Sequence, residues 1–257
     1  MKGRVAYIVA DLEGSTGAWT RPHTLLGTPE WQEARVELTR DINAVAESLW
    51  EMGVKRVVVK DFHRTGYNLI PKYLDRRVKL VSGYYIGPAV GYGNLHDADF
   101  ALFVGLHAAG GNKDGFLSHT LTSRIAEILV NGERICEAEL FATVLAAFKV
   151  PVCFFSGCPV ACREAARKME WLVTYEIAKD PEIYGDEKKR REYIHKRRQG
   201  LKAKIKKISS PEKNPFLRCS PHLTAGSFFT KKTKPGAGTP GTFLRRGKLS
   251  TSAPTNF

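Results

Sequence analysis

The stretch RVAYIVADLEGSTG, residues 4–17, decides the fold of this 257-residue chain. Its first half, Val5–Ala10, is an apolar run of strand length and is rich in β-branched residues. A run that is hydrophobic throughout is typical of a strand buried on both faces of a parallel sheet. Two acids, Asp11 and Glu13, follow at once, and Gly14 comes next. Carboxylates directly after a buried strand raise the question of what they bind.

The same pattern recurs along the chain, with helical segments between the strands. Residues 28–53 carry apolar side chains at helical spacing, with Thr28 as the expected N-cap and Gly53 as the expected stop. Asn131-Gly132 indicates a hairpin turn. The further expected strands are residues 54–61, 99–107 and 150–157, and a further helix is expected over 137–149. We therefore predict an α/β fold, a mostly parallel sheet covered by helices on both faces.

The charge of the chain is concentrated near its C-terminus. The formal net charge is +14, and residues 180–257 hold 19 Lys and Arg against 6 Asp and Glu. We expect an ordered body over 1–179, a basic helix over 180–208, and a poorly ordered, Pro-, Gly- and Ser-rich tail over 209–257. A basic helix could bind nucleic acid or another anionic surface. Because no recognisable nucleic-acid module surrounds it, we rank nucleic acid as an unlikely partner.

The cysteine count and the hydropathy indicate a cellular compartment. Five cysteines are an odd number, and the N-terminus shows no secretory signal. No stretch reaches about 18 consecutive apolar residues, the length that spans a bilayer. We therefore expect a cytoplasmic protein with no disulfide framework and no membrane partner.

Acids and histidines follow several of the expected strands. The carboxyl ends of parallel strands meet at one edge of a sheet, where ligands of such folds gather. Any one of these residues alone could be a turn cap or a hydrogen-bonded core histidine, but their recurrence at three strand ends favours a shared site. Their oxygen and nitrogen donors suit Zn²⁺, Mn²⁺ or Co²⁺, and a carboxylate can bridge two ions. The candidates are Asp11, Glu13, Asp61, His63, His107, His119, Glu137 and Glu139.

Five motifs occur in the order and roughly the spacing of one known family. They are DLEG (11–14), KDFH (60–63, where that family usually has Asn-Asp-x-His), GLHA (105–108), SH (118–119) and NGERICEAEL (131–140). The chain thus resembles the zinc-dependent D-aminopeptidases linked to dipeptide-transport operons, from about Val5 to about Ala166. Beyond about Lys168 we find no motif of that family.

The resemblance implies a site with two Zn²⁺ per chain. Asp11 would bridge the ions, Glu13 and His107 would hold one, and His63 and Glu137 would hold the other. His119 would be the catalytic residue, assigned in that family as the nucleophile. The substrates would be short peptides with an N-terminal D-amino acid, such as D-alanyl dipeptides. The subunits would form a homo-oligomer, in that family a decameric ring.

The chemistry of the residues agrees with this assignment but leaves two questions open. Zinc polarises an amide carbonyl, and a second ion can hold the amino group of a substrate. An imidazole outside the ligand set, as at His119, can act as nucleophile or as general base. The resemblance implies that Glu137, and not Glu139, is the metal ligand. On a helix the two side chains point in different directions, so Glu139 would face away from the ions. A metal-dependent amidohydrolase acting on another small amide is the alternative function.

Overall fold

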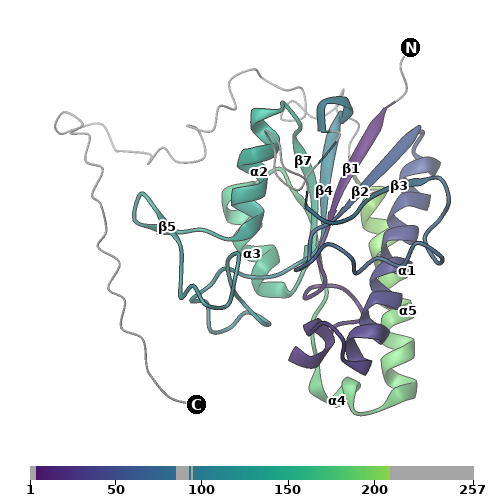
Figure 1. Ribbon diagram of the computed structural model, residues 1–257, viewed down its shortest axis with the longest axis vertical. Helices are drawn as coiled ribbons and strands as arrows, with labels where there is room; N and C mark the ends of the chain where they lie inside the picture. The colour runs from purple at the N-terminus through teal and green to yellow at the C-terminus, as the bar shows by residue number, and fades with distance from the viewer. Residues whose placement is uncertain (1–3, 85–92, 94, 209–257) are drawn as a thin grey trace.

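The computed structural model describes residues 4–84, 93 and 95–208, and its centre is a six-stranded sheet in which every neighbouring pair of strands is parallel (Figure 1). The order across the sheet is β3-β2-β1-β4-β7-β8. The strands are β1 (Val5–Ala10), β2 (Arg56–Asp61), β3 (Val78–Val81), β4 (Phe100–Leu106), β7 (Val152–Gly157) and β8 (Val173–Glu176).

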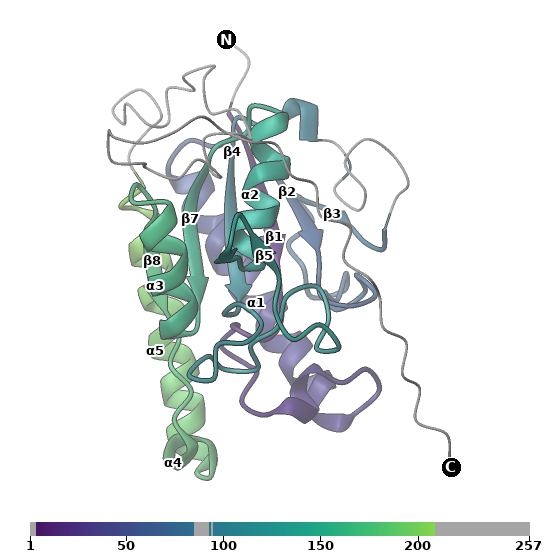
Figure 2. The same ribbon diagram turned by 90° about the vertical axis from the view of Figure 1, so that its left-hand side faces the viewer.

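Helices cover both faces of this sheet (Figures 1 and 2). Helices α1 (Pro29–Glu51) and α5 (Glu187–Ile205) lie on one face, and α2 (Glu137–Ala147) and α3 (Pro159–Lys168) lie on the other. The side chains of β1 explain the two layers. Val5, Tyr7 and Val9 join the core beneath α2 and α3, whereas the alternate residues pack toward α1. The predicted α/β architecture is therefore confirmed.

The direction of winding changes between β1 and β4. Strand β1 is followed by α1 on one face, whereas β4 leads into α2 on the other. The chain segments that leave these two neighbouring strands therefore diverge, which opens a crevice beyond their carboxyl ends. Asp11 and His107 are the residues that directly follow these two strands. The fold thus places them on either side of the crevice.

Several local predictions are confirmed. Thr28 caps α1, because its side chain accepts a hydrogen bond from the Trp31 N–H at 3.1 Å. Asn131 and Gly132, both at positive φ, join the antiparallel strands β5 (Leu129–Val130) and β6 (Glu133–Arg134). The remaining short elements are η1 (Arg21–Thr24), η2 (Leu95–Asp97) and α4 (Pro181–Tyr184). None of the helices described is long and apolar enough to cross a membrane.

The range 180–208, predicted as one basic helix, contains two helices, the short α4 and the longer α5, and α5 packs against the body. Leu201 and Ile205 are fully buried in the core that α1 shares. The division of the chain at residue 179 stays a prediction, and the expected tail over 209–257 lies outside the described residues. The four cysteines in the described part of the chain are buried free thiols.

Candidate metal centre

One cavity of about 900 Å³ lies beyond the carboxyl ends of β1, β2 and β4. The structure brings all six residues of the predicted site to its wall. Four different connections supply them, so the cluster is a product of the fold and not of local sequence. They are Asp11, Glu13, His63, His107, His119 and Glu137.

Two glycines allow the segments after β1 and β4 to approach closely. The Gly14 N–H donates to the Gly105 carbonyl oxygen at 2.7 Å. A Cβ atom at Gly14 would lie 2.0 Å from the Leu106 carbonyl oxygen, and Gly105 has a φ of +82°. Neither position accepts a larger residue without displacing backbone. The DLEG turn and His107 are thereby held against each other.

Each of the three imidazoles has its Nδ1 atom next to an oxygen that only accepts hydrogen bonds. The Nδ1 atoms of His107 and His119 lie 3.0 Å and 2.9 Å from the carbonyl oxygens of Ala108 and Leu117. Nδ1 therefore carries the proton in the neutral ring, and Nε2 keeps its lone pair. Backbone carbonyls commonly orient metal-binding histidines in this way.

His63 is oriented by Asn68, a residue that sequence analysis missed. Its Nδ1 atom lies 3.1 Å from the Asn68 Oδ1 atom. The amide group of Asn68 is itself fixed, because its Nδ2 atom donates to Asp61 Oδ1 at 2.8 Å and to the His63 carbonyl oxygen. Asp61, one of the acids noted at the strand ends, therefore supports His63 indirectly. No signal in the sequence indicated this contact, because a loop after the KDFH motif returns Asn68 to the side of His63.

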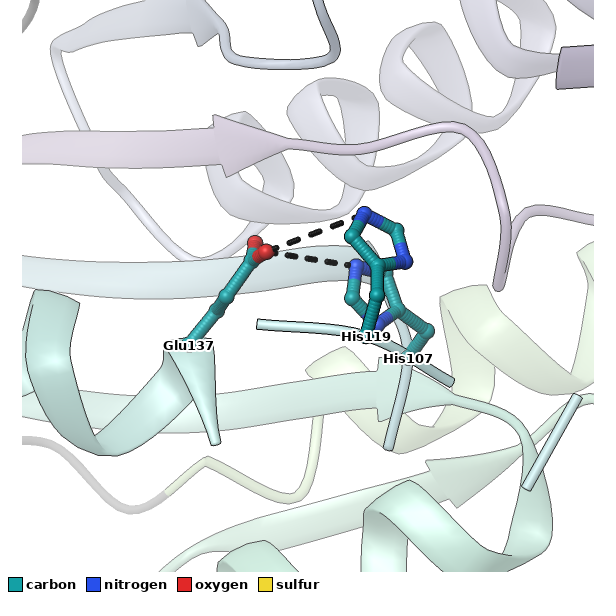
Figure 3. Close-up of side chains that lie close together, drawn as sticks. All are labelled: His107, His119 and Glu137. Atoms are coloured by element: carbon teal, nitrogen blue, oxygen red, sulfur yellow. Dashed lines mark ion pairs between the residues drawn. The ribbon is translucent and has the colours of Figure 1, made fainter. Parts of the chain in front are cut away.

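The Nε2 atoms face the carboxylates. His63 Nε2 lies 3.2 Å from Glu13 Oε1, and His107 Nε2 lies 3.5 Å from Asp11 Oδ2 and 3.6 Å from Glu137 Oε1. The rings of His107 and His119 stack with centroids 3.9 Å apart, and the Glu137 carboxylate points toward both (Figure 3). His119 Nε2 lies 3.9 Å from Glu137 Oε1.

The division of ligands implied by the resemblance stays a prediction. That division grouped Glu13 with His107, and His63 with Glu137. Asp11, Glu13 and His107 offer donor atoms within 4.8 Å of one another, which is compatible with the first of these groups. Short contacts also join Glu13 to His63, and Glu137 to His107. His107, His119 and Glu137 also offer donor atoms within 4.8 Å of one another, so His119 itself is within reach of an ion.

The cavity is electrostatically unfavourable without a cation. Burial, with the charges of Glu13 and Glu137, raises the pKa of Asp11 well above its usual range. Burial also raises the pKa of Glu137 to about 7. Burial opposes ionisation of Glu13 too, but the charge and hydrogen bond of His63 hold its pKa below the usual range. Asp11 and Glu137 therefore lack compensating positive charge.

The donor atoms fit one or more metal ions. Asp11 Oδ2, Glu13 Oε2 and His63 Nε2 are buried and have no hydrogen-bond partner within the described residues. When the His63 ring is neutral, with its proton on Nδ1, Nε2 and Glu13 Oε1 are both acceptors, so their 3.2 Å contact is a hydrogen bond only when His63 is protonated. Buried acceptors without donors are costly, and a divalent cation bound by carboxylate and imidazole removes that cost.

Glu139 points away from this cluster, as the sequence predicted. Its carboxylate accepts a hydrogen bond from the Cys136 N–H at 2.7 Å, at the first turn of α2. Glu137, two residues earlier, instead accepts from the Leu121 N–H at 2.8 Å and faces the cavity. The N-terminus of α2 thus uses one acid to cap the helix and presents the other to the site.

Comparison with known families identifies this arrangement. Residues 4–223 match the family model of the D-aminopeptidases, peptidase family M55. The chain belongs to the D-aminopeptidase family. The match confirms the resemblance, and it extends well past Lys168, where no family motif was found in the sequence. The D-aminopeptidase match therefore includes α5, whose packing onto α1 makes it part of the fold.

A solved D-aminopeptidase has the same fold. It is the Zn-dependent D-aminopeptidase DppA from Bacillus subtilis, described as a self-compartmentalizing protease. The two proteins are 23% identical, with a TM-score of 0.69 over 79% of this chain and 72% of that one. No curated protein matches the sequence.

Proposed function

We propose that this D-aminopeptidase hydrolyses short peptides with an N-terminal D-amino acid, of the D-alanyl dipeptide type, with two zinc ions. The observation that carries the proposal is the orientation of the imidazoles. The three rings have Nδ1 atoms held by oxygens, so their Nε2 atoms are directed at a cavity lined by Asp11, Glu13 and Glu137. Family membership supports peptide hydrolysis, and the zinc dependence of the solved relative supports the choice of metal.

The contacts support a specific set of ligands. Asp11 would be shared between the ions, Glu13 and His107 would hold one ion, and His63 and Glu137 would hold the other. Zinc, when bound, supplies a Lewis acid that polarises the amide carbonyl of a substrate. The protein's contribution is to fix each donor atom through the contacts of Asn68 and the backbone carbonyls.

His119 is proposed as the catalytic residue. It is less buried than the ligand histidines, with a side chain 20% exposed against 1% for His107. Its Nε2 atom is free to attack a carbonyl or to remove a proton, while its Nδ1 atom is held by Leu117. Stacking on His107 sets the plane of its ring next to the proposed ions.

The test compares zinc content and D-alanyl-D-alanine hydrolysis in His119→Ala, with exposed His195→Ala as a control. We expect full zinc and a loss of kcat of about 10²–10⁴-fold for a general base, or activity at background for a nucleophile. Loss of zinc would make His119 a ligand. Unchanged turnover, or hydrolysis of other small amides but not of D-alanyl dipeptides by wild type, would contradict the proposal.

A homo-oligomer in the cytoplasm is part of the same proposal. The solved relative is described as self-compartmentalizing, which supports assembly of this chain around its sites. A ring would limit substrates to short peptides that can enter it. The decameric count and the cytoplasmic location stay predictions.

A further inference from the structure

Three arginines line the same cavity as the proposed metal ligands. Arg21 begins η1, Arg64 directly follows His63, and Arg124 lies in the loop after His119. They come from three separate segments, and all three are exposed. The cavity therefore combines a buried acidic floor with arginines at its solvent-facing wall.

These arginines have no acidic partner in the described part of the chain. Other arginines there are paired, for example Arg77 with Asp75 at 2.8 Å and Arg198 with Asp41 at 2.9 Å. Neither the ion pairs nor the ring contacts within the described residues involve Arg21, Arg64 or Arg124. The acids of the floor thus leave the three guanidinium groups free for an anion.

The backbone at Arg64 holds an unfavourable conformation. Its φ is +49°, a region that costs a non-glycine residue roughly 1–2 kcal/mol. The tight turn that requires it is closed by the Gly66 N–H, which donates to the His63 carbonyl oxygen at 2.9 Å. Arg64 thus occupies a position beside a proposed ligand where asparagine or glycine would be less strained.

We infer that these arginines bind the C-terminal carboxylate of a short peptide, so that the enzyme selects substrates with that free carboxylate. The inference rests on the proposed function and names the second recognition group of its substrate. A guanidinium matches a carboxylate with two parallel hydrogen bonds. A dipeptide carries its amino group and its carboxylate about 7 Å apart. The lining of the cavity offers the proposed metal ligands, which are buried, and the three arginines, which are exposed.

The experiment measures binding apart from turnover. Zinc-loaded His119→Ala protein is titrated by calorimetry with D-alanyl-D-alanine and with D-alanyl-D-alaninamide, which lacks the negative charge. We expect the free acid to bind roughly 10- to 100-fold more tightly. Arg21→Gln, Arg64→Asn and Arg124→Gln are each added to this background. Asparagine is chosen at 64 because it tolerates positive φ. At least one replacement should reduce the acid-to-amide ratio severalfold.

The control is Arg76→Gln, an exposed arginine that does not line the cavity, and it should keep the ratio. Equal binding of acid and amide, or a ratio that none of the three replacements lowers, overturns the inference. Hydrolysis by wild type is assayed separately. A preserved binding preference without hydrolysis of the dipeptide would refute the proposed function and leave the carboxylate site standing.

Discussion

Two groups of buried carboxylates differ in how their charge is balanced. Asp11 and Glu13 are about 5% exposed, and the protein supplies them with imidazoles but no lysine or arginine contact among the described residues. Asp41 of α1 is fully buried as well, yet Arg198 of α5 lies 2.9 Å from it. The Thr16 N–H and hydroxyl also donate to Asp41, each at 2.9 Å.

The difference separates a binding site from a structural contact. Where the chain itself provides the cation, as between α1 and α5, the acid has completed its hydrogen bonds and serves the fold. Where acids are gathered and left with orphaned oxygen atoms, the missing positive charge must come from outside. The two groups are also connected, because Thr16 belongs to the same turn as Asp11 and Glu13.

The largest expected effect comes from Asp11, the proposed shared ligand. Asp11→Ala should lose both zinc ions and all activity, because one carboxylate is removed from both ions. Glu13→Ala should mainly weaken one ion. Elemental analysis after mild dialysis measures the stoichiometry, and activity is measured on the same preparation.

Asp75→Ala provides the control for removing a carboxylate outside the cavity, since Asp75 pairs with Arg77 on the surface. It should retain both ions. A wild-type protein that holds no zinc even after zinc is added would refute the two-ion site. Equal zinc loss in Asp11→Ala and Glu13→Ala would refute only the shared role of Asp11.

The next effect is on stability and concerns Arg198. Arg198→Met should destabilise the protein by about 4 kcal/mol, because Asp41 would remain buried without its cation. Chemical denaturation of the zinc-loaded protein measures the change. Lys202→Met removes a more exposed pair with Glu47 and should have a much smaller effect.

If the denaturation curves of Arg198→Met and Lys202→Met coincide, the buried ion pair does not hold α5 in place. Zinc content gives a second reading. Since Arg198 also lies 3.3 Å from the Thr16 hydroxyl, its loss should loosen the DLEGSTG turn and weaken zinc binding without abolishing it.

The sheet and the basic helix could be predicted from the sequence because both signals are local. Apolar runs such as 100–106 indicate buried strands, and Thr28 followed by Pro29 marks a helix start. The docking of α5 could not be predicted, because Arg198 and Asp41 are 157 residues apart. From the composition, only an excess of positive charge could be predicted, and that charge suggested an anionic partner. In the structure, acids of α1 pair with part of this charge.

The third prediction uses pH to test the missing positive charge at the cavity through Glu137. In the folded, metal-free protein the pKa of Glu137 is about 7, above its ordinary value of 4.5. The folded state then binds the proton more tightly than the unfolded state. This contribution to stability is present below pH 4.5 and is lost as the pH rises through 7. Its size is on the order of 3 kcal/mol.

Denaturation in a chelator, from pH 4.5 to pH 8, compares wild type with Glu137→Gln. Wild type should lose this stability as the pH rises, whereas the variant should lose less, because glutamine does not ionise. Added zinc should restore wild type at pH 8, since it binds the ionised carboxylate. Parallel pH curves for the two proteins would contradict the assignment of Glu137 to a site that lacks compensating charge.

The ligand candidates could be predicted, but the residues that orient them could not. Strand ends identify Asp11, His63 and His107 because a parallel sheet gathers its carboxyl ends. Asn68 and the carbonyl oxygen of Leu117 lie in loops. The conformation of a loop leaves no periodic pattern in the sequence from which these contacts could be predicted. The same holds for the arginines at the cavity wall, which in sequence look like ordinary surface charges.

The smallest expected effect concerns Glu164 of α3, a half-buried acid beside the site whose oxygens are all used by the fold. Its Oε2 atom accepts from the Ala109 N–H at 2.8 Å, and its Oε1 atom accepts from Asn112 Nδ2 at 2.6 Å. The carbonyl oxygen of Asn112 in turn accepts from the Ser118 hydroxyl at 2.5 Å, next to His119. Glu164 therefore fixes the loop that connects His107 to the proposed catalytic residue.

Glu164→Gln keeps the shape of the side chain but places an NH₂ group against one of the two donors. One hydrogen bond is lost, and the loop that positions His119 becomes looser, so kcat should fall about fivefold while KM and zinc content stay the same. Glu170→Gln, an exposed acid just beyond α3, is the matched control and should leave kcat unchanged. A fall in melting temperature with normal kcat would place Glu164 with Asp41, among the acids that serve only the fold. A fall in kcat with zinc retained shows that an acid with complete hydrogen bonding also serves the reaction, by positioning a residue it does not touch.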